Sequence, residues 1–89
     1  MTFTRDQQRL FLMENDQLQA EITFPVIDDT TWLIEHIWVR NQPTKRQLAA
    51  SILDAAMTIV QTEHKRVVVL DPFARQVFAT TPAYQTLMR

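Results

Sequence analysis

The sequence predicts a small α+β domain, in which helices pack on a mixed, mostly antiparallel sheet. Residues 18–24 alternate between apolar and polar side chains, as a half-buried strand does. Residues 44–64 repeat apolar side chains at helical spacing, between two short apolar runs at 32–39 and 66–70. The predicted order is β-β-β-α-β-α-α, in a single domain over residues 1–89.

The first half of the chain reads as three strands joined by short turns. Residues 9–14 form a short apolar strand, and N-D-Q at 15–17 is a turn before the alternating strand. The turn cluster D-D-T-T at 28–31 precedes residues 32–39, which are apolar on both faces. We therefore expect an antiparallel meander whose third strand, at 32–39, is central and covered on two sides.

The second half opens with a long helix. Thr44 is a suitable N-cap, and Gln47 completes a T-x-x-Q capping box with it. The helix should end near His64, and its expected buried stripe consists of Leu48, Ile52, Ala55, Ala56 and Ile59. A strand at 66–70 after this helix should run parallel to the strand before it.

Two further helices follow the last strand. Asp71-Pro72 places a good N-cap before proline at the first helical position, and Thr81-Pro82 repeats the device. The last helix should extend through Leu87.

Composition excludes several classes of function. The 89 residues suffice for one domain, and 46% hydrophobic residues support a core. A net charge of -1 and no apolar run near 20 residues argue against a nucleic-acid partner or a membrane. Without cysteine, and with only two histidines, the chain offers no convincing metal site. Taken together, these features lead us to expect a soluble cytoplasmic domain. With no glycine, tight turns should use Asn, Asp, Pro or Thr.

Lys45 and Arg46 stand in the first turn of the long helix. The helix dipole places partial positive charge there, so two cations are unfavourable unless an anion lies beside them. Together with Arg40 they could contact phosphate groups. The plainer alternative is an ordinary capped helix with solvated cations, and the pattern does not decide between the two.

Four stretches, in this order and spacing, carry a resemblance to a known family: H-I-W-V (36–39), T-K-R-Q-L-A (44–49), V-V-L-D-P-F (68–73) and T-P-A-Y (81–84). They resemble the strand end, phosphate loop, second strand end and tail of small YjdJ-like members of the GNAT superfamily of acyl-CoA N-acetyltransferases. The resemblance covers roughly residues 9–88.

The resemblance implies acetyl-CoA as acyl donor, with its pyrophosphate on the N-terminus of the long helix. Its pantetheine arm would run between the splayed ends of the third and fourth strands. The cofactor-binding residues implied are Val39, Arg40, Thr44, Lys45, Arg46, Gln47, Leu48, Ala49, Leu70, Pro72 and Phe73.

The resemblance also implies His36 and Asp71 as candidate catalytic groups. An amine would attack the thioester carbonyl directly, a backbone N–H near Val39 would polarise that carbonyl, and His36 or Asp71 would accept the proton. From the residues alone, a hydrogen-bonded histidine on a sheet face is favoured for His36 and a helix cap for Asp71, although Asp71 can hold both roles. The acceptor amine is not specified, and the chain is expected to be a monomer or weak homodimer.

This chain departs from the family pattern at three places. The loop glycines fall on Lys45, Gln47 and Ala49, the cysteine of some members falls on Asp71, and the tail histidine falls on Thr81. An alternative function is therefore a GNAT-like module that binds CoA weakly, or binds a protein, without turnover.

Overall fold

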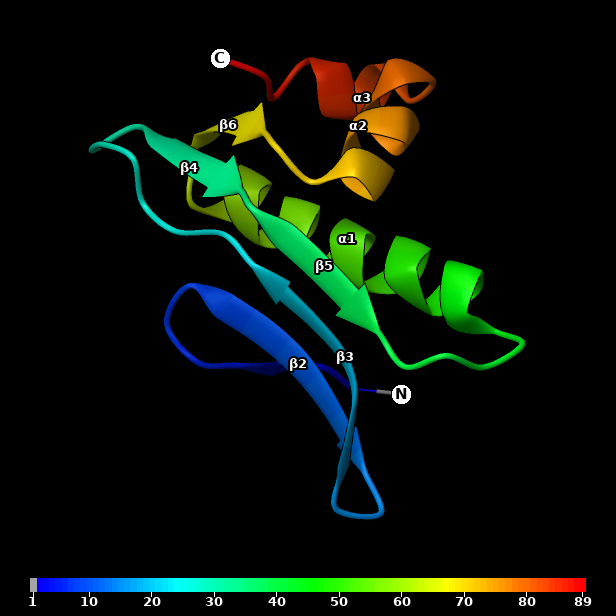
Figure 1. The fold of residues 1–89 in the computed structure, drawn as a ribbon. Helices are drawn as coiled ribbons and strands as arrows, with labels where there is room; N and C mark the ends of the chain where they lie inside the picture. Colours follow the sequence, from blue (N-terminus) through cyan, green and yellow to red (C-terminus); the bar gives the residue numbers. More distant parts are fainter. Residues whose placement is uncertain (1) are drawn as a thin grey trace.

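The computed structural model describes residues 2–89 and confirms the predicted α+β fold (Figure 1). Its elements, in chain order, are β1 (Thr4–Arg5), β2 (Arg9–Glu14), β3 (Gln17–Thr23), β4 (Thr31–Ile34), β5 (His36–Val39), α1 (Lys45–Thr62), β6 (Arg66–Val69), α2 (Pro72–Ala79) and α3 (Pro82–Gln85). Of the helices in this part of the chain, none is long and apolar enough to cross a bilayer.

The strands form two hydrogen-bonded sets, and the consecutive strands β4 and β5 belong to different sets. β1, β2, β3 and β5 pair antiparallel in that order, whereas β4 pairs in parallel with β6. The parallel strand–helix–strand unit was predicted correctly. The two-residue strand β1, which pairs Thr4 with Phe11, was not predicted.

The expected strand at 32–39 is interrupted at Glu35, where the pairing with β6 ends; before that point the N–H of Leu33 already donates to the Pro25 carbonyl, just after β3, at 2.8 Å. The carbonyl of Ile34 accepts hydrogen bonds from the N–H groups of Leu70 and Asp71, on the β6 side. The next N–H, that of Glu35, donates instead to Thr23 of β3, at 3.0 Å. The stretch is therefore β4 before Glu35 and β5 after it; the two follow one another in nearly the same direction, and β6 lies beside β4 only (Figure 1).

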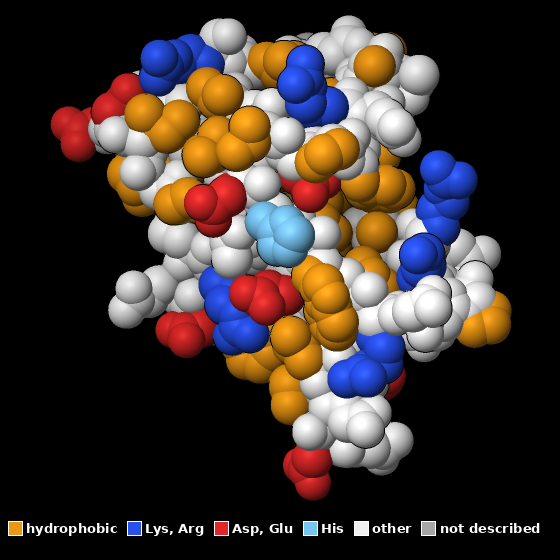
Figure 2. Space-filling view, in the orientation of Figure 1, with side chains coloured by type: hydrophobic (Ala, Val, Ile, Leu, Met, Phe, Trp, Pro, Cys, Tyr) orange, Lys and Arg blue, Asp and Glu red, His pale blue; other side chains and the backbone are white. Residues whose placement is uncertain are grey.

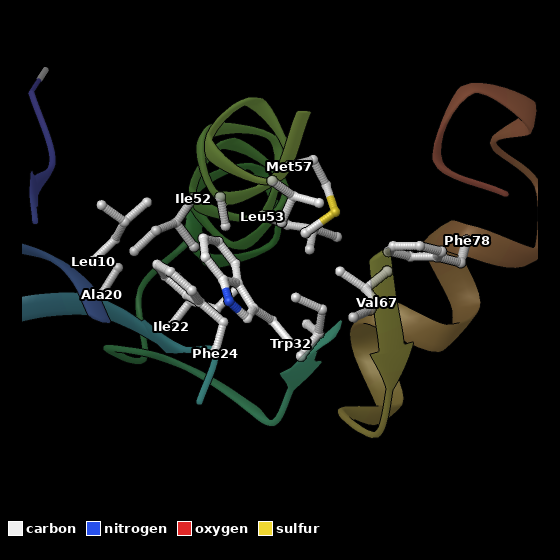
Figure 3. Packing of buried hydrophobic residues seen from close by; sticks show 14 of the residues in the cluster. Leu10, Ala20, Ile22, Phe24, Trp32, Ile52, Leu53, Met57, Val67 and Phe78 are labelled. Carbon is white, nitrogen blue, oxygen red and sulfur yellow. The ribbon is translucent and has the colours of Figure 1, made fainter. Parts of the chain in front are cut away.

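The core lies between α1 and one face of the strands (Figure 3). Ile22, Ile34, Ile52 and Leu53 are fully buried there, from β3, β4 and α1. Two residues of the predicted helix stripe, Ala55 and Ile59, are only half-buried at its margin. Most of the opposite side chains of the same strands are half-buried or exposed, with Gln19 and Thr31 as buried exceptions, and α1 covers only the inner side of the sheet.

The helix starts differ from the prediction in two of three cases. Thr44 is the residue before α1, but its hydroxyl makes no capping hydrogen bond, so the predicted capping box is wrong. Its backbone is near the helical region, with φ -94° and ψ 11°, rather than in the extended region that a side-chain cap requires. Thr81 also lacks a capping bond, because its hydroxyl donates back to the Val77 carbonyl at 2.6 Å. Asp71 does cap α2, and α3 ends at Gln85 rather than Leu87.

Four residues take the left-handed conformation that glycine would normally supply. They are Gln7, Asn15, Asp16 and His64, with φ between 52° and 62°. Asn15 and Asp16 match the expected turn chemistry, whereas Gln7 and His64 do not. His64 ends α1 in a Schellman motif, since the N–H of Lys65 reaches back to the Val60 carbonyl at 3.0 Å.

Replacing a left-handed side chain by glycine should stabilise the protein. For a non-glycine residue this conformation costs about 1–2 kcal/mol. Glycine avoids that cost, but part of the gain is offset because glycine loses more conformational entropy on folding. We expect Asp16→Gly and His64→Gly each to raise the free energy of unfolding by about 0.5–1 kcal/mol in urea titrations. A matched control is Ala50→Gly, at an exposed position within α1, which should lower it by about 1 kcal/mol. Equal destabilisation by all three glycines would contradict this account.

Candidate functional site

The divergence after Glu35 leaves one edge of β5 without a strand partner. The N–H of Arg40 donates to Gln19 of β3 at 2.9 Å. The N–H of Ile37 turns the other way and donates to Asp71 Oδ2, also at 2.9 Å. Because alternate residues of a strand point their N–H groups to the same side, the N–H of Val39 faces away from β3 as well. The edge formed by Ile37 and Val39 therefore faces the beginning of α2 across a gap.

Asp71 closes one end of this gap. Its side chain is 4% exposed, and its two oxygens accept different bonds: Oδ2 from the N–H of Ile37, and Oδ1 from the N–H of Ala74 at 2.9 Å. The predicted N-cap role of Asp71 is thus confirmed, and the same carboxylate also ties β5 to α2. Both oxygens are occupied by backbone donors.

A cavity of about 370 Å³ opens along the inner side of this edge. Five residues predicted to bind the cofactor line it, namely Val39, Lys45, Arg46, Ala49 and Phe73. They come from β5, the first turns of α1 and the first turn of α2. Figure 2 shows Lys and Arg side chains gathered at the side of the molecule where α1 begins, next to hydrophobic ones. The cavity therefore has an apolar wall and a basic rim.

The first turn of α1 retains hydrogen-bond donors. The N–H of Lys45 donates to the Gln42 carbonyl at 3.1 Å, and the N–H of Leu48 to the Thr44 carbonyl at 3.0 Å. Between them, the N–H groups of Arg46 and Gln47 have no hydrogen-bond acceptor among residues 2–89. Since no acidic residue lies in this turn, these donors and the two cations form an anion-receptive helix end.

The other predicted cofactor residues lie around this cavity rather than in it. Thr44, Gln47 and Leu48 line a separate hollow of about 340 Å³, on the side of α1 that faces Leu12. The guanidinium of Arg40 is engaged, since its Nε donates to the Leu18 carbonyl at 3.0 Å. Leu70 and Pro72 are exposed beside the gap. The structure thus gathers only part of the predicted set into one cavity.

His36 lies on the other face of the sheet. It opens β5 with an exposed side chain, whereas its neighbour Ile37 lines the cavity. The His36 side chain forms no hydrogen bond with Asp71, although Asp71 accepts one from the N–H of the adjacent residue, Ile37. Ile37 lines the candidate cavity but was not among the residues predicted from the sequence. The alternation of β5 could have found it, because Ile37 shares its side of the strand with Val39.

Tyr84, from the T-P-A-Y stretch, ties α3 to α1. Its hydroxyl donates to Asp54 Oδ1 at 2.5 Å, and its ring packs on Phe78 with centroids 5.2 Å apart. Burial and the neighbouring Asp54 carboxylate raise the pKa of Tyr84 well above its ordinary value. The residue is a packing anchor that stays protonated. Within residues 2–89, no group of three or more His, Asp or Glu side chains is placed to hold a metal ion.

The fold and the site define a class of protein in which the sheet splays open and an apolar cavity leads from the gap to an anion-receptive helix start. Comparison with family models identifies the family, since the model described as GCN5-related N-acetyl-transferase matches residues 9–87. This chain belongs to that family.

Among solved structures, the fold is similar to the NMR structure of a GCN5-like protein from Staphylococcus aureus. The two chains superpose with a TM-score of 0.81 at 16% sequence identity, over 99% of this chain and 87% of the other. At this identity the likeness concerns the fold. A comparison with curated proteins found no match.

Removing the Asp71 carboxylate should destabilise the protein strongly. Asp71→Ala leaves the N–H groups of Ile37 and Ala74 without acceptors, and each buried unpaired donor costs about 1–3 kcal/mol. We expect the free energy of unfolding in urea to fall by about 2–4 kcal/mol. Thr81→Ala is the matched control, because Thr81 precedes a proline-started helix without capping it; it should cost less than about 1 kcal/mol. Equal losses would refute the bridging role.

Proposed function

We propose that this protein transfers the acetyl group of acetyl-CoA to an amine. Family membership suggests acetyl transfer. The observation that carries the proposal is the start of α1, where two N–H groups without acceptors and two cations border a cavity that continues along the open edge of β5.

The residues present fit a pyrophosphate at this helix start. Backbone N–H groups and the helix dipole favour an anion, and the side chains of Lys45 and Arg46 add charge-assisted contacts. Lys45 and Gln47 stand where the resembled loop has glycine, yet both are exposed rather than packed over the helix end. The N–H groups of Arg46 and Gln47 therefore stay accessible without glycine. The mild dipole penalty of two cations in the first turn is offset once an anion is bound.

The open edge of β5 would hold the thioester end of the donor. A bound acetyl thioester supplies an activated carbonyl carbon. The N–H of Val39, which faces the gap, is placed to donate to the carbonyl oxygen and stabilise the charge that develops there. The amine nitrogen forms a bond to the carbonyl carbon, the carbon–sulfur bond breaks, and the proton lost by nitrogen balances the leaving thiolate.

We assign the proton acceptor to His36 rather than Asp71. His36 is exposed beside the gap, and an imidazole nitrogen can accept a proton from the amine, directly or through one water. Asp71 is buried with both oxygens bound to backbone N–H groups, so its role is to position β5 against α2.

The proposal has three further parts. The chain would belong with the small YjdJ-like members of the family, residues 1–89 would form a single domain, and the protein would be cytoplasmic.

Reversing the charge at the helix start should weaken donor binding. Lys45→Glu and Arg46→Glu each place a carboxylate beside the bound phosphates, so we expect the Kd for acetyl-CoA to rise about tenfold or more. Thermal melting at fixed acetyl-CoA measures this, since a ligand that binds the folded state raises Tm. Arg75→Glu, on α2 and outside this cavity, is the charge-matched control and should keep the full shift. If wild-type protein shows no shift at millimolar acetyl-CoA, the donor assignment fails.

Removing the His36 imidazole should slow transfer without loosening the donor. We expect His36→Ala to lower kcat about 100-fold in an assay of thiol release, with an unchanged Tm shift by acetyl-CoA. His64→Ala, at the far end of α1, controls for loss of a histidine and should retain wild-type kcat. Equal kcat for His36→Ala and wild type would remove His36 from the mechanism. Donor binding without thiol release for any amine would instead identify a module that binds CoA without turnover.

A further inference from the structure

The two ends of β5 are held differently. At its start, the N–H of Ile37 donates to Asp71 Oδ2 at 2.9 Å, so this end is bound on the α2 side and also paired with β3. At its other end, Val39 is the last residue of the ladder with β3, and the chain then leaves the sheet for the turn that leads to α1. Across the gap from Val39, β5 has no strand partner within residues 2–89. The hydrogen bonds that hold this end of β5 to other strands therefore come from the β3 side alone.

Arg40 makes the last of these bonds, twice over. Its backbone N–H donates to the Gln19 carbonyl at 2.9 Å, and its side-chain Nε donates to the carbonyl of the preceding residue of β3, Leu18, at 3.0 Å. The ladder itself ends with the pair of Val39 and Ala20. One residue thus binds two successive carbonyl groups of the strand that runs beside β5 (Figure 1) and extends the attachment beyond the ladder.

The Arg40 side chain points away from the cavity. Its guanidinium carbon lies 5.9 Å from the centroid of the Trp38 ring. Successive side chains of a strand alternate between its faces, so Trp38 and Arg40 share one face, whereas Ile37 and Val39 share the other and line the cavity. The guanidinium is held between this ring and the Leu18 carbonyl. Its placement favours a role within the sheet over a contact with donor phosphates at the start of α1.

Holding Arg40 in this way fixes the direction of the neighbouring N–H, that of Val39. Trp38 pairs with Glu21 on one side of Val39, and Arg40 is bound to Gln19 on the other. Because the N–H groups of adjacent strand residues point to opposite sides, these two attachments direct the Val39 N–H into the gap. A donor that stabilises developing charge must be held in place before reaction, and a displacement of about 1 Å can cost 100-fold in rate.

We propose, on the basis of the proposed acetyl transfer, that Arg40 is a positioning residue. It attaches the end of β5 to β3 and so directs the Val39 N–H toward the acetyl carbonyl oxygen, while Arg40 itself touches neither reactant. Asp71 and Arg40 then hold the two ends of the open edge of β5, one from each side. Loss of the Arg40 side chain frees the Val39 end but leaves the start of α1, where the phosphates would bind, unchanged.

Replacing Arg40 should separate catalysis from donor binding. Arg40→Met keeps an unbranched stem beside Trp38 and removes both the Nε donor and the charge. We expect kcat to fall about 10- to 100-fold, with an unchanged Kd for acetyl-CoA. Arg40→Lys keeps the charge without the planar fork that reaches both ring and carbonyl, so kcat should fall here too. Thiol release is measured with the amine that wild-type protein uses fastest among amino acids, polyamines and lysine peptides.

Arg5→Met is the matched control. The Nε of Arg5 donates to the Gln7 carbonyl at 2.8 Å, and its guanidinium carbon lies 5.9 Å from the Trp32 ring centroid. These are the same two kinds of contact as those of Arg40, but in β1. Arg5 also forms an ion pair with Glu63, so its loss should lower stability at least as much. We expect wild-type kcat for Arg5→Met at a temperature well below the Tm of both variants.

Infrared spectroscopy of bound acetyl-CoA labelled with ¹³C at the acetyl carbonyl tests the position of the N–H directly. A hydrogen bond from Val39 polarises this carbonyl and lowers its stretching frequency. We expect the band at a higher frequency in Arg40→Met than in wild type, and at the wild-type frequency in Arg5→Met. A change in stability alone would not move this band, and the measurement needs no acceptor amine.

The outcomes separate this inference from the proposed function. Wild-type kcat and carbonyl frequency in Arg40→Met would overturn the positioning role and leave acetyl transfer standing. A raised Kd in Arg40→Met but not in Arg40→Lys, with kcat and frequency unchanged, would show a phosphate contact instead. Equal losses of kcat in Arg40→Met and Arg5→Met, without a frequency change, would reduce the effect to stability. If wild-type protein binds no acetyl-CoA, the proposed function itself fails and this inference with it.

Discussion

The structure depends on one carboxylate that binds two backbone donors from different elements. Asp71 accepts from Ile37 in β5 and from Ala74 in α2, and it is almost fully buried. A strand edge that turns away from its sheet leaves N–H groups without partners, and each such buried group is costly. By satisfying the N–H of Ile37, Asp71 allows β5 to diverge from β6 without an added strand. Asp71 supplies an acceptor for the N–H of Ile37 only, so the rest of this edge of β5 stays open as the gap.

The pairing with β6 ends at the same place, next to Glu35. The Ile34 carbonyl accepts from the N–H groups of both Leu70 and Asp71, which ends the parallel ladder. The N–H of Glu35 donates to the Thr23 carbonyl of β3. Residues 35 and 37 would share one side of a regular strand, yet their N–H groups point to opposite sides. This irregularity turns the edge of β5 outward and leaves the N–H of Val39 facing the gap. The sheet topology and the geometry of the proposed donor site are thus set by the same few backbone bonds.

The sequence predicted the features that arise from local chemistry. Alternation over 18–24, the long helix and the Asp71 cap follow from periodicity and from the short reach of a carboxylate, and all three hold. The split of residues 32–39 was not predictable in this way, because both halves are apolar and only their partners differ. The left-handed His64 and Gln7 were also missed, since a chain without glycine must place other residues there. For the site, the cavity residues that follow helix or strand periodicity were found, whereas Ile37 depended on knowing which edge of β5 is open.

The absence of a capping bond from Thr44 bears on the proposed phosphate site, which contains no glycine. The N–H groups that a Thr44 hydroxyl would cap are those of the second and third residues of α1, Arg46 and Gln47. In the structure Thr44 has a helical rather than an extended backbone, because the chain already turns at Gln42, whose carbonyl accepts from Lys45. The hydroxyl cannot then reach back over the helix end. The same two donors that a cap would have consumed therefore remain available, next to two cations that would otherwise be unfavourable in that turn. A helix start that is poorly capped and carries misplaced charge is a weak beginning for the isolated helix, and both defects are corrected together when an anion binds there.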